Sequence, residues 1–149
     1  MLTIRQATPG DAAALHELYT RHLTQTPPEE PQDTAQWSAL LAAFAADPGY
    51  HLLVGELDGR VVSSVTVIVI QNLTHNLRPY AVIENVVTHA DFRDRGYASA
   101  LMEAASEIAR ENNCYKIMLL TGSKKESTLR FYGRCGFDMH AKTAFLKRL

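Results

Sequence analysis

The stretch YAVIENVVTHADFRDRGYASA, residues 80–100, decides the fold, because it passes from a strand through a basic turn into a helix. Tyr80–Thr88 is strand-like, and Gly96–Asn112 carries small and apolar residues at helical spacing on one side. A short strand follows at Lys116–Thr121. We therefore predict a βαβ unit over residues 80–121, with its two strands side by side and parallel.

The remaining elements are predicted outward from this unit. Strands are expected at Thr3–Ala7, His51–Leu57, Arg60–Leu73 and Phe137–Lys147. Helices are expected after the N-cap Thr8, at Thr34–Ala46 with Trp37, Leu40, Leu41 and Phe44 on one face, and from the capping box at Ser123 to Arg134. Asp58-Gly59 suits a two-residue hairpin turn. This order predicts an α/β (α+β) protein in which helices pack on a mixed sheet.

Composition limits the class of protein. The 149 residues fit one domain, 1–149, and the hydrophobic share of 46% is ordinary for a globular chain. A net charge of −1 argues against a general nucleic-acid or anionic-membrane binder. Cys114 and Cys135 are too few for a disulfide framework, and no apolar run is long enough to span a bilayer or to form a signal peptide. We expect a cytoplasmic protein.

The turn Arg93-Asp94-Arg95-Gly96-Tyr97-Ala98 predicts an anion site. It opens a helix, where free backbone N–H groups and the positive end of the helix dipole attract negative charge. Gly96 lets a phosphate approach the backbone, and Arg93 and Arg95 add positive charge. The pattern R-x-x-G-x-A is neither a Walker A loop nor G-x-G-x-x-G, so those nucleotide-binding folds are not supported. From these six residues alone, an ordinary basic loop is the alternative.

Glu84 lies in the middle of an apolar strand, where alternation places it on the same face as Val82 and Val86. Because an unpaired buried charge is costly, we expect this carboxylate in a cleft or in an ion pair. A carboxylate held in a partly buried cleft suits a general base. A structural glutamate bonded to an arginine or to a backbone amide is the alternative.

A third motif, Phe131-Tyr132-Gly133-Arg134-Cys135-Gly136-Phe137, follows the second strand of the unit. Taken alone, Tyr132 is typical of a core aromatic residue with its hydroxyl at the surface. In combination, however, a strand, R-x-x-G-x-A, a helix, a strand and F-Y-x-x-x-G-F resemble the GCN5-related N-acetyltransferase family. Ile4-Arg5-Gln6-Ala7-Thr8 followed by Asp11 is similar to the family's opening, so the resemblance covers essentially the whole chain.

The resemblance implies the acyl-CoA N-acyltransferase fold: a mixed, mostly antiparallel central sheet with a splayed parallel strand pair and helices on both faces. It implies acetyl-CoA as co-substrate, Tyr132 beside the thioester sulfur and Glu84 as the base. The pantetheine arm of acetyl-CoA would pair with the strand residues Val86, Val87 and Thr88. The pyrophosphate loop would be Arg93, Asp94, Arg95, Gly96, Tyr97, Ala98 and Ser99. No metal is expected, because the histidines lack zinc-binding spacing.

Two positions depart from the family pattern: Thr128 stands where members often carry an alanine, and Lys125 is the other. Lys125 stands where members often carry an asparagine that contacts coenzyme A. A lysine there could meet a phosphate instead, and a solvated lysine in the first helical turn is the alternative.

The expected activity is transfer of the acetyl group from acetyl-CoA to the amine of a small molecule, by direct attack in a ternary complex. Two alternatives stay open. One is a non-catalytic acetyl-CoA-binding or sensor protein of the same fold, and the other is an acetyltransferase that acts on a protein N-terminus or lysine. The resemblance also implies a homodimer formed through the last strand, whereas nucleic-acid and membrane partners are not expected.

Overall fold

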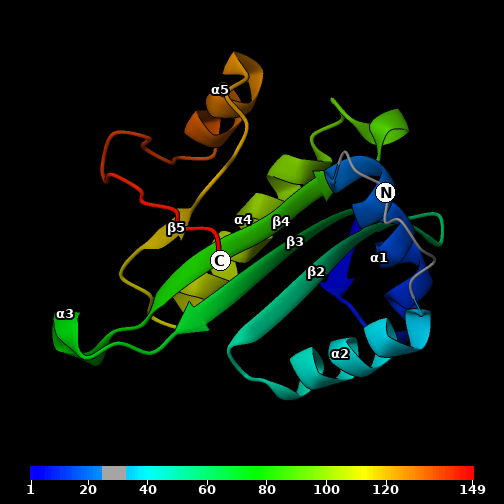
Figure 1. Cartoon of the computed structure of the whole chain (residues 1–149), viewed down its shortest axis with the longest axis horizontal. Helices are drawn as coiled ribbons and strands as arrows, with labels where there is room; N and C mark the ends of the chain where they lie inside the picture. The colour runs from blue at the N-terminus through cyan, green and yellow to red at the C-terminus, as the bar shows by residue number, and fades with distance from the viewer. Residues whose placement is uncertain (25–32) are drawn as a thin grey trace.

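A five-stranded sheet forms the centre of the computed structural model, which describes residues 1–24 and 33–149 (Figure 1). Its strands lie in chain order: β1 (Thr3–Gln6), β2 (Tyr50–Leu57), β3 (Arg60–Ile70), β4 (Tyr80–Thr88) and β5 (Ile117–Leu119). Neighbouring strands are antiparallel except β4 and β5, which are parallel. The predicted mixed sheet, mostly antiparallel with one parallel pair, is confirmed.

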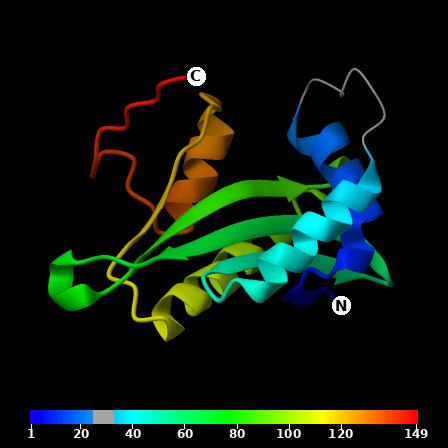
Figure 2. The same ribbon diagram turned by 60° about the horizontal axis from the view of Figure 1, so that its bottom comes forward.

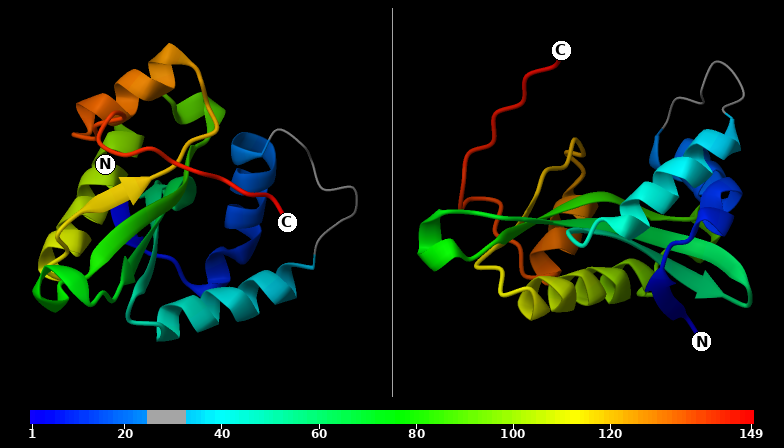
Figure 3. Two further views of the ribbon diagram at one scale, coloured as in Figure 1. Left: turned by 60° about the vertical axis from the view of Figure 1, so that its left-hand side comes forward. Right: turned by 90° about the horizontal axis from the view of Figure 1, so that it is seen from below.

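Helices lie on both faces of the sheet (Figures 1 and 3). One face is covered by α1 (Ala12–Leu18), its π-helical continuation η2 (Tyr19–Leu23) and α2 (Thr34–Ala46). The other is covered by α4 (Tyr97–Glu111) and α5 (Glu126–Arg134). The remaining helical turns are η1 (Pro9–Asp11), α3 (Thr74–Leu77) and η3 (Ala90–Phe92). A separate apolar core lies on each face of the sheet, and the sheet separates the two cores.

The central hairpin follows the sequence prediction closely. Asp58 and Gly59 both have positive φ, 50° and 79°, as a type I′ turn requires. The strand β3 is third of five, and Val65 and Val67 have no exposed surface. It ends at Ile70 rather than at Leu73, and α3 then projects from the body of the protein as an arm (Figure 1). The inner face of α2 is also narrower than predicted, since Leu40 is 54% exposed.

The strands β4 and β5 pair only over a short distance. Ala81–Ile83 lie opposite Ile117–Leu119, and β4 then continues to Thr88 paired, among the described strands, with β3 alone. The two parallel strands therefore diverge beyond Ile83, as the expected splayed pair should. This divergence opens the sheet on one side of β4.

A β-bulge interrupts β4 at the point of divergence. The pairing with β3 shifts between Ser64 and Thr66, and Asn85 takes a left-handed φ of 54°. The bulge reverses the alternation, so Val86 packs in the α4 core while Val87 packs in the α1 core. The predicted common face of Glu84 and Val86 is therefore wrong.

The predicted last strand, Phe137–Lys147, is also wrong. Phe137 ends a Schellman motif in which its N–H donates to Tyr132 O at 3.1 Å and the N–H of Gly136, at φ 92°, donates to Gly133 O at 3.0 Å. This motif sends the chain away from the sheet, and residues 138–149 form no strand and are exposed (Figure 2). We call residues 138–149 the tail.

The start of α5 differs from the predicted capping box as well. The helix begins at Glu126, and its N-cap is Lys125 rather than Ser123. Ser123 Oγ instead accepts from the backbone N–H of Lys125 at 3.3 Å and lies 3.2 Å from Thr128 Oγ1. The serine therefore shapes the turn before the helix and does not cap it.

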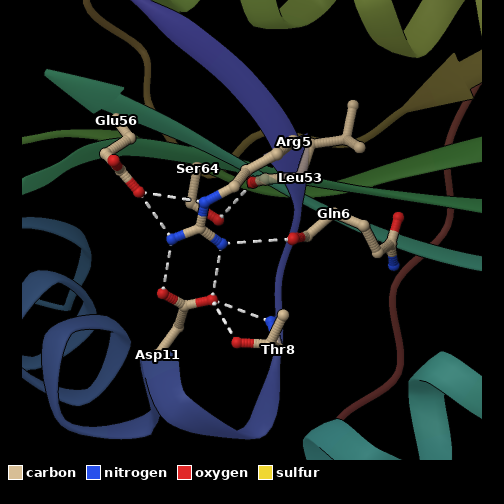
Figure 4. Close-up of polar contacts among 7 residues, drawn as sticks. All are labelled: Arg5, Gln6, Thr8, Asp11, Leu53, Glu56 and Ser64. Atoms are coloured by element: carbon tan, nitrogen blue, oxygen red, sulfur yellow. Dashed lines mark hydrogen bonds and ion pairs between the residues drawn. The ribbon is translucent and has the colours of Figure 1, made fainter. Parts of the chain in front are cut away.

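An ion-pair network fixes the N-terminal strand to its neighbours (Figure 4). The guanidinium of Arg5 donates to both carboxylate oxygens of Asp11 at 2.8 Å and to Glu56 Oε2 at 2.7 and 2.9 Å. Asp11 also accepts from the Thr8 N–H at 2.7 Å. The Arg5 hydrogen bonds, followed by that of Thr8, hold the pKa of Asp11 below its ordinary 3.8 in spite of burial.

We expect Asp11→Asn to lower the free energy of unfolding by about 2 kcal/mol at pH 7, because the half-buried guanidinium of Arg5 loses its bidentate partner and keeps only Glu56. Since the folded state lowers the pKa of Asp11, the carboxylate stabilises the protein fully above pH 3.8 and loses this effect as the pH falls through the lowered pKa. Urea titrations should therefore show the gap between the two proteins closing in acid. Glu17→Gln, at an exposed pair with Arg21, is the control, and an equal loss there would contradict the account.

Candidate active site

A cleft of about 210 Å³ lies where β4 and β5 diverge. Its lining comes from the β4 bulge, the chain after β5, η2 and α5. The lining residues are Leu23, Ile83, Glu84, Asn85, Val86, Leu119, Leu120, Thr121, Gly122 and Tyr132. The local sequence explains the opening, because the bulge at Asn85 and the early end of β5 remove the hydrogen bonds that would close the sheet.

Glu84 contributes the carboxylate of this cleft. The expectation that it lies in a cleft is confirmed, but the side chain is exposed and forms no ion pair with any described residue. The alternative of a structural glutamate bonded to an arginine therefore has no support in residues 1–24 and 33–149. Its carboxylate is free to receive a cationic group.

Tyr132 comes from α5 and reaches the same cleft. Its ring packs against Phe131 and Phe137, with centroids 5.1 and 6.3 Å away, and it is half-buried. Burial raises the pKa of Tyr132, and the neighbouring Cys135 and Glu84 raise it further. The phenol therefore stays protonated at neutral pH and can donate a hydrogen bond into the cleft.

The start of α4 has the geometry of an anion site. Its N-cap is Gly96 in the left-handed region, at φ 79°, and no side chain of the described residues caps the helix. The first backbone N–H groups thus lack partners within the helix. Asp94 is also left-handed, at φ 59°, and a Cβ built on Gly96 would meet no atom within 4 Å. The backbone here is open to a ligand from outside.

The two arginines of this loop are partly engaged within the protein. Arg93 donates to Thr88 O at 3.2 Å and to His22 O at 3.4 Å, which ties η2 to the end of β4. The guanidinium carbon of Arg95 lies 5.3 Å from the ring centroid of Phe92. Arg93 therefore builds the loop in addition to adding positive charge beside it.

The structure brings Glu84, Val86 and Tyr132 into one cleft and places the other predicted site residues outside its lining. Val87 is buried under α1, and Thr88 Oγ1 lies 2.8 Å from Ser63 Oγ. Lys125 is exposed at the start of α5. Sequence reasoning missed the lining residues Leu23, Ile83, Asn85 and Leu119 to Gly122. For Asn85 a signal existed, since asparagine tolerates the left-handed backbone of a bulge.

The described residues contain no group of three or more His, Cys, Asp or Glu side chains that could hold a metal ion. Within the same ranges, no helix is both long enough and apolar enough to cross a membrane.

The cleft between diverging strands and the uncapped helix start agree with the comparisons with known proteins. Residues 12–137 match the model of the acetyltransferase (GNAT) family. The chain belongs to this family. As a member it is an acetyltransferase, and the fold implied by the sequence resemblance is confirmed.

The similarity to known relatives extends over most of the chain. A solved structure from Agrobacterium tumefaciens str. C58 is 41% identical, with a TM-score of 0.88 over 99% of both chains. Glucosamine 6-phosphate N-acetyltransferase of Trypanosoma brucei brucei is 29% identical over 123 residues, 81% of this chain and 79% of the relative. Aminoglycoside N-acetyltransferase AAC(6')-Iy in complex with CoA shares the fold, with a TM-score of 0.78 at 15% identity over 99% of this chain and 95% of that one.

Proposed function

We propose that this GNAT protein transfers the acetyl group of acetyl-CoA to the amine of a small molecule, by direct attack within a ternary complex. The observation that carries the proposal is the cleft in which Glu84 from β4 faces the same space as Tyr132 from α5. A relative that acts on glucosamine 6-phosphate supports a small polar amine as acceptor.

Glu84 is proposed as the general base. An alkylammonium has a pKa of about 10.4, so the acceptor arrives charged and must lose a proton before its nitrogen can attack. An exposed, unpaired carboxylate at the cleft binds the ammonium and takes this proton directly or through a water. The nitrogen then bonds to the thioester carbonyl carbon, and the bond from that carbon to sulfur breaks. Backbone N–H groups at the β4 bulge, near Val86 and Val87, would stabilise the oxygen as charge develops on it.

Tyr132 is proposed to stabilise the departing thiolate. Phenol and thiol have ordinary pKa values of about 10 and 8.5, so complete proton transfer from tyrosine to the thiolate is uphill by about 2 kcal/mol. Burial raises the pKa of Tyr132 and widens this gap. A hydrogen bond from the phenol to the sulfur, with protonation completed late or from solvent, therefore suits the residue better than early proton donation.

The cofactor site is proposed along β4 and the start of α4. Val86, Val87 and Thr88 would pair with the pantetheine arm, because no strand in the described part of the chain pairs with β4 on this side beyond Ile83. The uncapped N–H groups support a pyrophosphate site in the loop Arg93–Ser99, and the open space at Gly96 admits a phosphate. The exposed Lys125 could meet a phosphate from the side of α5.

A panel of amines with acetyl-CoA, followed by the release of free thiol, tests the proposal. We expect turnover with at least one small polar primary amine. Acetyl-CoA binding without thiol release for any amine would favour the non-catalytic sensor. Turnover confined to peptides would favour a protein N-terminus or lysine as the acceptor.

We also propose that two copies pair. Among the described residues, every exposed large apolar side chain except Met1 and Leu40 lies on the α3 arm, on or just after β5, or on the tail. These are Leu73, Leu77, Met118, Leu120, Met139, Phe145, Leu146 and Leu149. The edge of β5 is also open. Sedimentation equilibrium should give twice 16.6 kDa, and a mass of 16.6 kDa at micromolar concentration would contradict pairing.

A further inference from the structure

Two histidines meet beside the cleft. His22 belongs to η2 and His89 follows β4, and their ring centroids lie 4.1 Å apart. The residue after His22 is Leu23, which lines the cleft. The turn η2 is π-helical, with the Thr24 N–H donating to Tyr19 O at 2.9 Å, and π-helical turns are frequent at functional sites. The histidine pair therefore lies where η2 reaches the wall of the cleft.

Three contacts hold η2 against the chain between β4 and α4. Besides the ring contact with His89, the backbone N–H of Ala90 donates to His22 Nδ1 at 3.3 Å, and Arg93 donates to His22 O at 3.4 Å. Arg93 also donates to Thr88 O at 3.2 Å, so one guanidinium bridges η2 and the end of β4. All three contacts are made by His22. This residue therefore joins the cleft wall to the loop that is proposed to bind the pyrophosphate.

The contact with Ala90 requires an unprotonated Nδ1 on His22. A backbone N–H can only donate, and a ring nitrogen accepts only through a free lone pair. Neutral His22 therefore has its proton on Nε2. A second proton on Nδ1 would place an N–H against the N–H of Ala90, so the hydrogen bond would be lost and two donors would face each other.

His89 has the same requirement. Arg60 donates to His89 Nε2 at 2.8 Å, and the backbone N–H of Asp91 is directed at Nδ1 at 3.2 Å. A neutral imidazole has one acceptor nitrogen and can satisfy one of these donors, whereas a protonated imidazole can satisfy neither. A proton on Nε2 would also face the charge of Arg60. The contacts around both rings are thus those of neutral histidines.

The surroundings of His22 also oppose its protonation. Burial lowers the pKa of His22 below its ordinary 6.5, and His89 and Arg93 lower it further. Glu17 of α1 and Asp91 of η3 are the acidic groups that raise it, with smaller effects. Because the pKa is lowered, His22 is neutral at pH 7 and becomes charged as the pH falls below 6.5.

We propose that neutral His22 is a positioning residue, which holds η2 against the loop and so keeps Leu23 in the cleft wall, and that its protonation releases this wall and weakens binding of the acceptor amine. This inference rests on the proposed function, because it takes the cleft beside Glu84 as the amine site. The amine should therefore bind well near neutral pH and poorly in mild acid.

His22→Asn tests the role of the proton, since the asparagine oxygen can accept from Ala90 near the place of Nδ1 and gains no charge in acid. An alkylamine with a pKa of about 10.4 stays almost wholly protonated below pH 8, so the change in free amine is equal for both proteins and cancels in their ratio. We expect the KM for the amine of the wild type, divided by that of the variant, to rise about 5- to 10-fold as the pH falls from about 7.5 to about 5, which corresponds to one lost hydrogen bond. The ratio of the two kcat values should not change.

Two further variants separate the proton from the side chain. His75→Asn is the matched control, because His75 is an exposed histidine on α3 that stacks on Tyr115. Its KM for the amine should follow the wild type at every pH. His22→Leu removes the acceptor nitrogen, so it should show the raised KM already at about pH 7.5, where His22→Asn should not.

A titration followed by NMR tests the same link without activity. In the wild type, the imidazole C–H signal of His22 and the backbone amide signals of Leu23 and Ala90 should titrate with one midpoint below pH 6.5. In His22→Asn the two amide signals should stay fixed over this range. Amide signals of Leu23 and Ala90 that do not move with the His22 ring would refute the link.

The failures of the two proposals differ. If the wild type releases no thiol with any amine, the proposed function is wrong and the effect on amine binding fails with it, whereas the NMR titration still decides whether His22 holds η2. If the wild type acetylates an amine and His22→Asn shows the same dependence of KM on pH, the proposed function stands and the role of His22 is refuted.

Discussion

Replacing Tyr132 with phenylalanine is expected to lower kcat about 100-fold, at the lower end of what proton-transfer groups contribute. The variant removes only the hydroxyl and keeps the packing of the ring against Phe131 and Phe137. Since the phenol is proposed to act on the thiolate that forms in the transition state, the dissociation constant of acetyl-CoA should change little. Steady-state kinetics and a titration with acetyl-CoA measure the two quantities separately.

A half-buried tyrosine outside the cleft provides the control for this experiment. Tyr115 stacks on His75 at 3.7 Å between ring centroids and does not line the cleft. Tyr115→Phe should therefore retain the wild-type kcat. Full activity in the Tyr132→Phe variant would show that thiolate departure needs no help from this residue.

The second large effect is expected for Glu84→Gln, and it should depend on pH. Near pH 7 almost all of an alkylamine with a pKa of about 10.4 is protonated, so loss of the base should lower kcat/KM about 100-fold. As the pH rises toward the pKa of the amine, the fraction of free amine grows and the need for a base declines. The ratio of wild-type to variant kcat/KM should therefore decrease steadily between pH 7 and pH 10.

The shape of this pH profile separates two roles of Glu84. A loss that is equal at every pH would mean that the carboxylate positions the acceptor and does not remove its proton. Glu103→Gln is a suitable control, because Glu103 is an exposed carboxylate on α4 that pairs with Arg110 outside the cleft. This variant should follow the wild-type profile throughout.

Much of the fold could be predicted because its elements have local signals. Apolar residues at helical spacing gave α4 to within one residue at each end, and Asp58-Gly59 gave the hairpin turn. The parallel arrangement of β4 and β5 followed from the connection between them. Predictions of this kind depend on residues that are near one another in the chain.

The errors arose where structure depends on contacts between distant residues. Alternation assumes a regular ladder, so it missed the bulge at Asn85 and misplaced Val86. The tail has a strand-like pattern, but a strand also needs an edge to pair with, and the Schellman motif at Gly136 directs the tail elsewhere. The residue pattern of one segment does not say which other segment of the chain it will pair with.

The same distinction applies to the candidate site. Glu84 and Tyr132 could be named from motifs, and the structure places both at one cleft. Leu23 and Gly122 could not be named, because their place in the cleft depends on how η2 and the chain after β5 approach the bulge of β4. No motif in the chain marks that approach.

The central claim is that the start of α4 holds the pyrophosphate and that Tyr132 faces the sulfur of the bound thioester. A crystal structure with acetyl-CoA tests it most directly. We predict phosphate oxygens at hydrogen-bond distance, about 2.7–3.2 Å, from backbone N–H groups of Tyr97 to Ser99, and the Tyr132 hydroxyl directed at the sulfur. A nucleotide bound elsewhere, or a Tyr132 hydroxyl turned to solvent away from the thioester, would contradict the account.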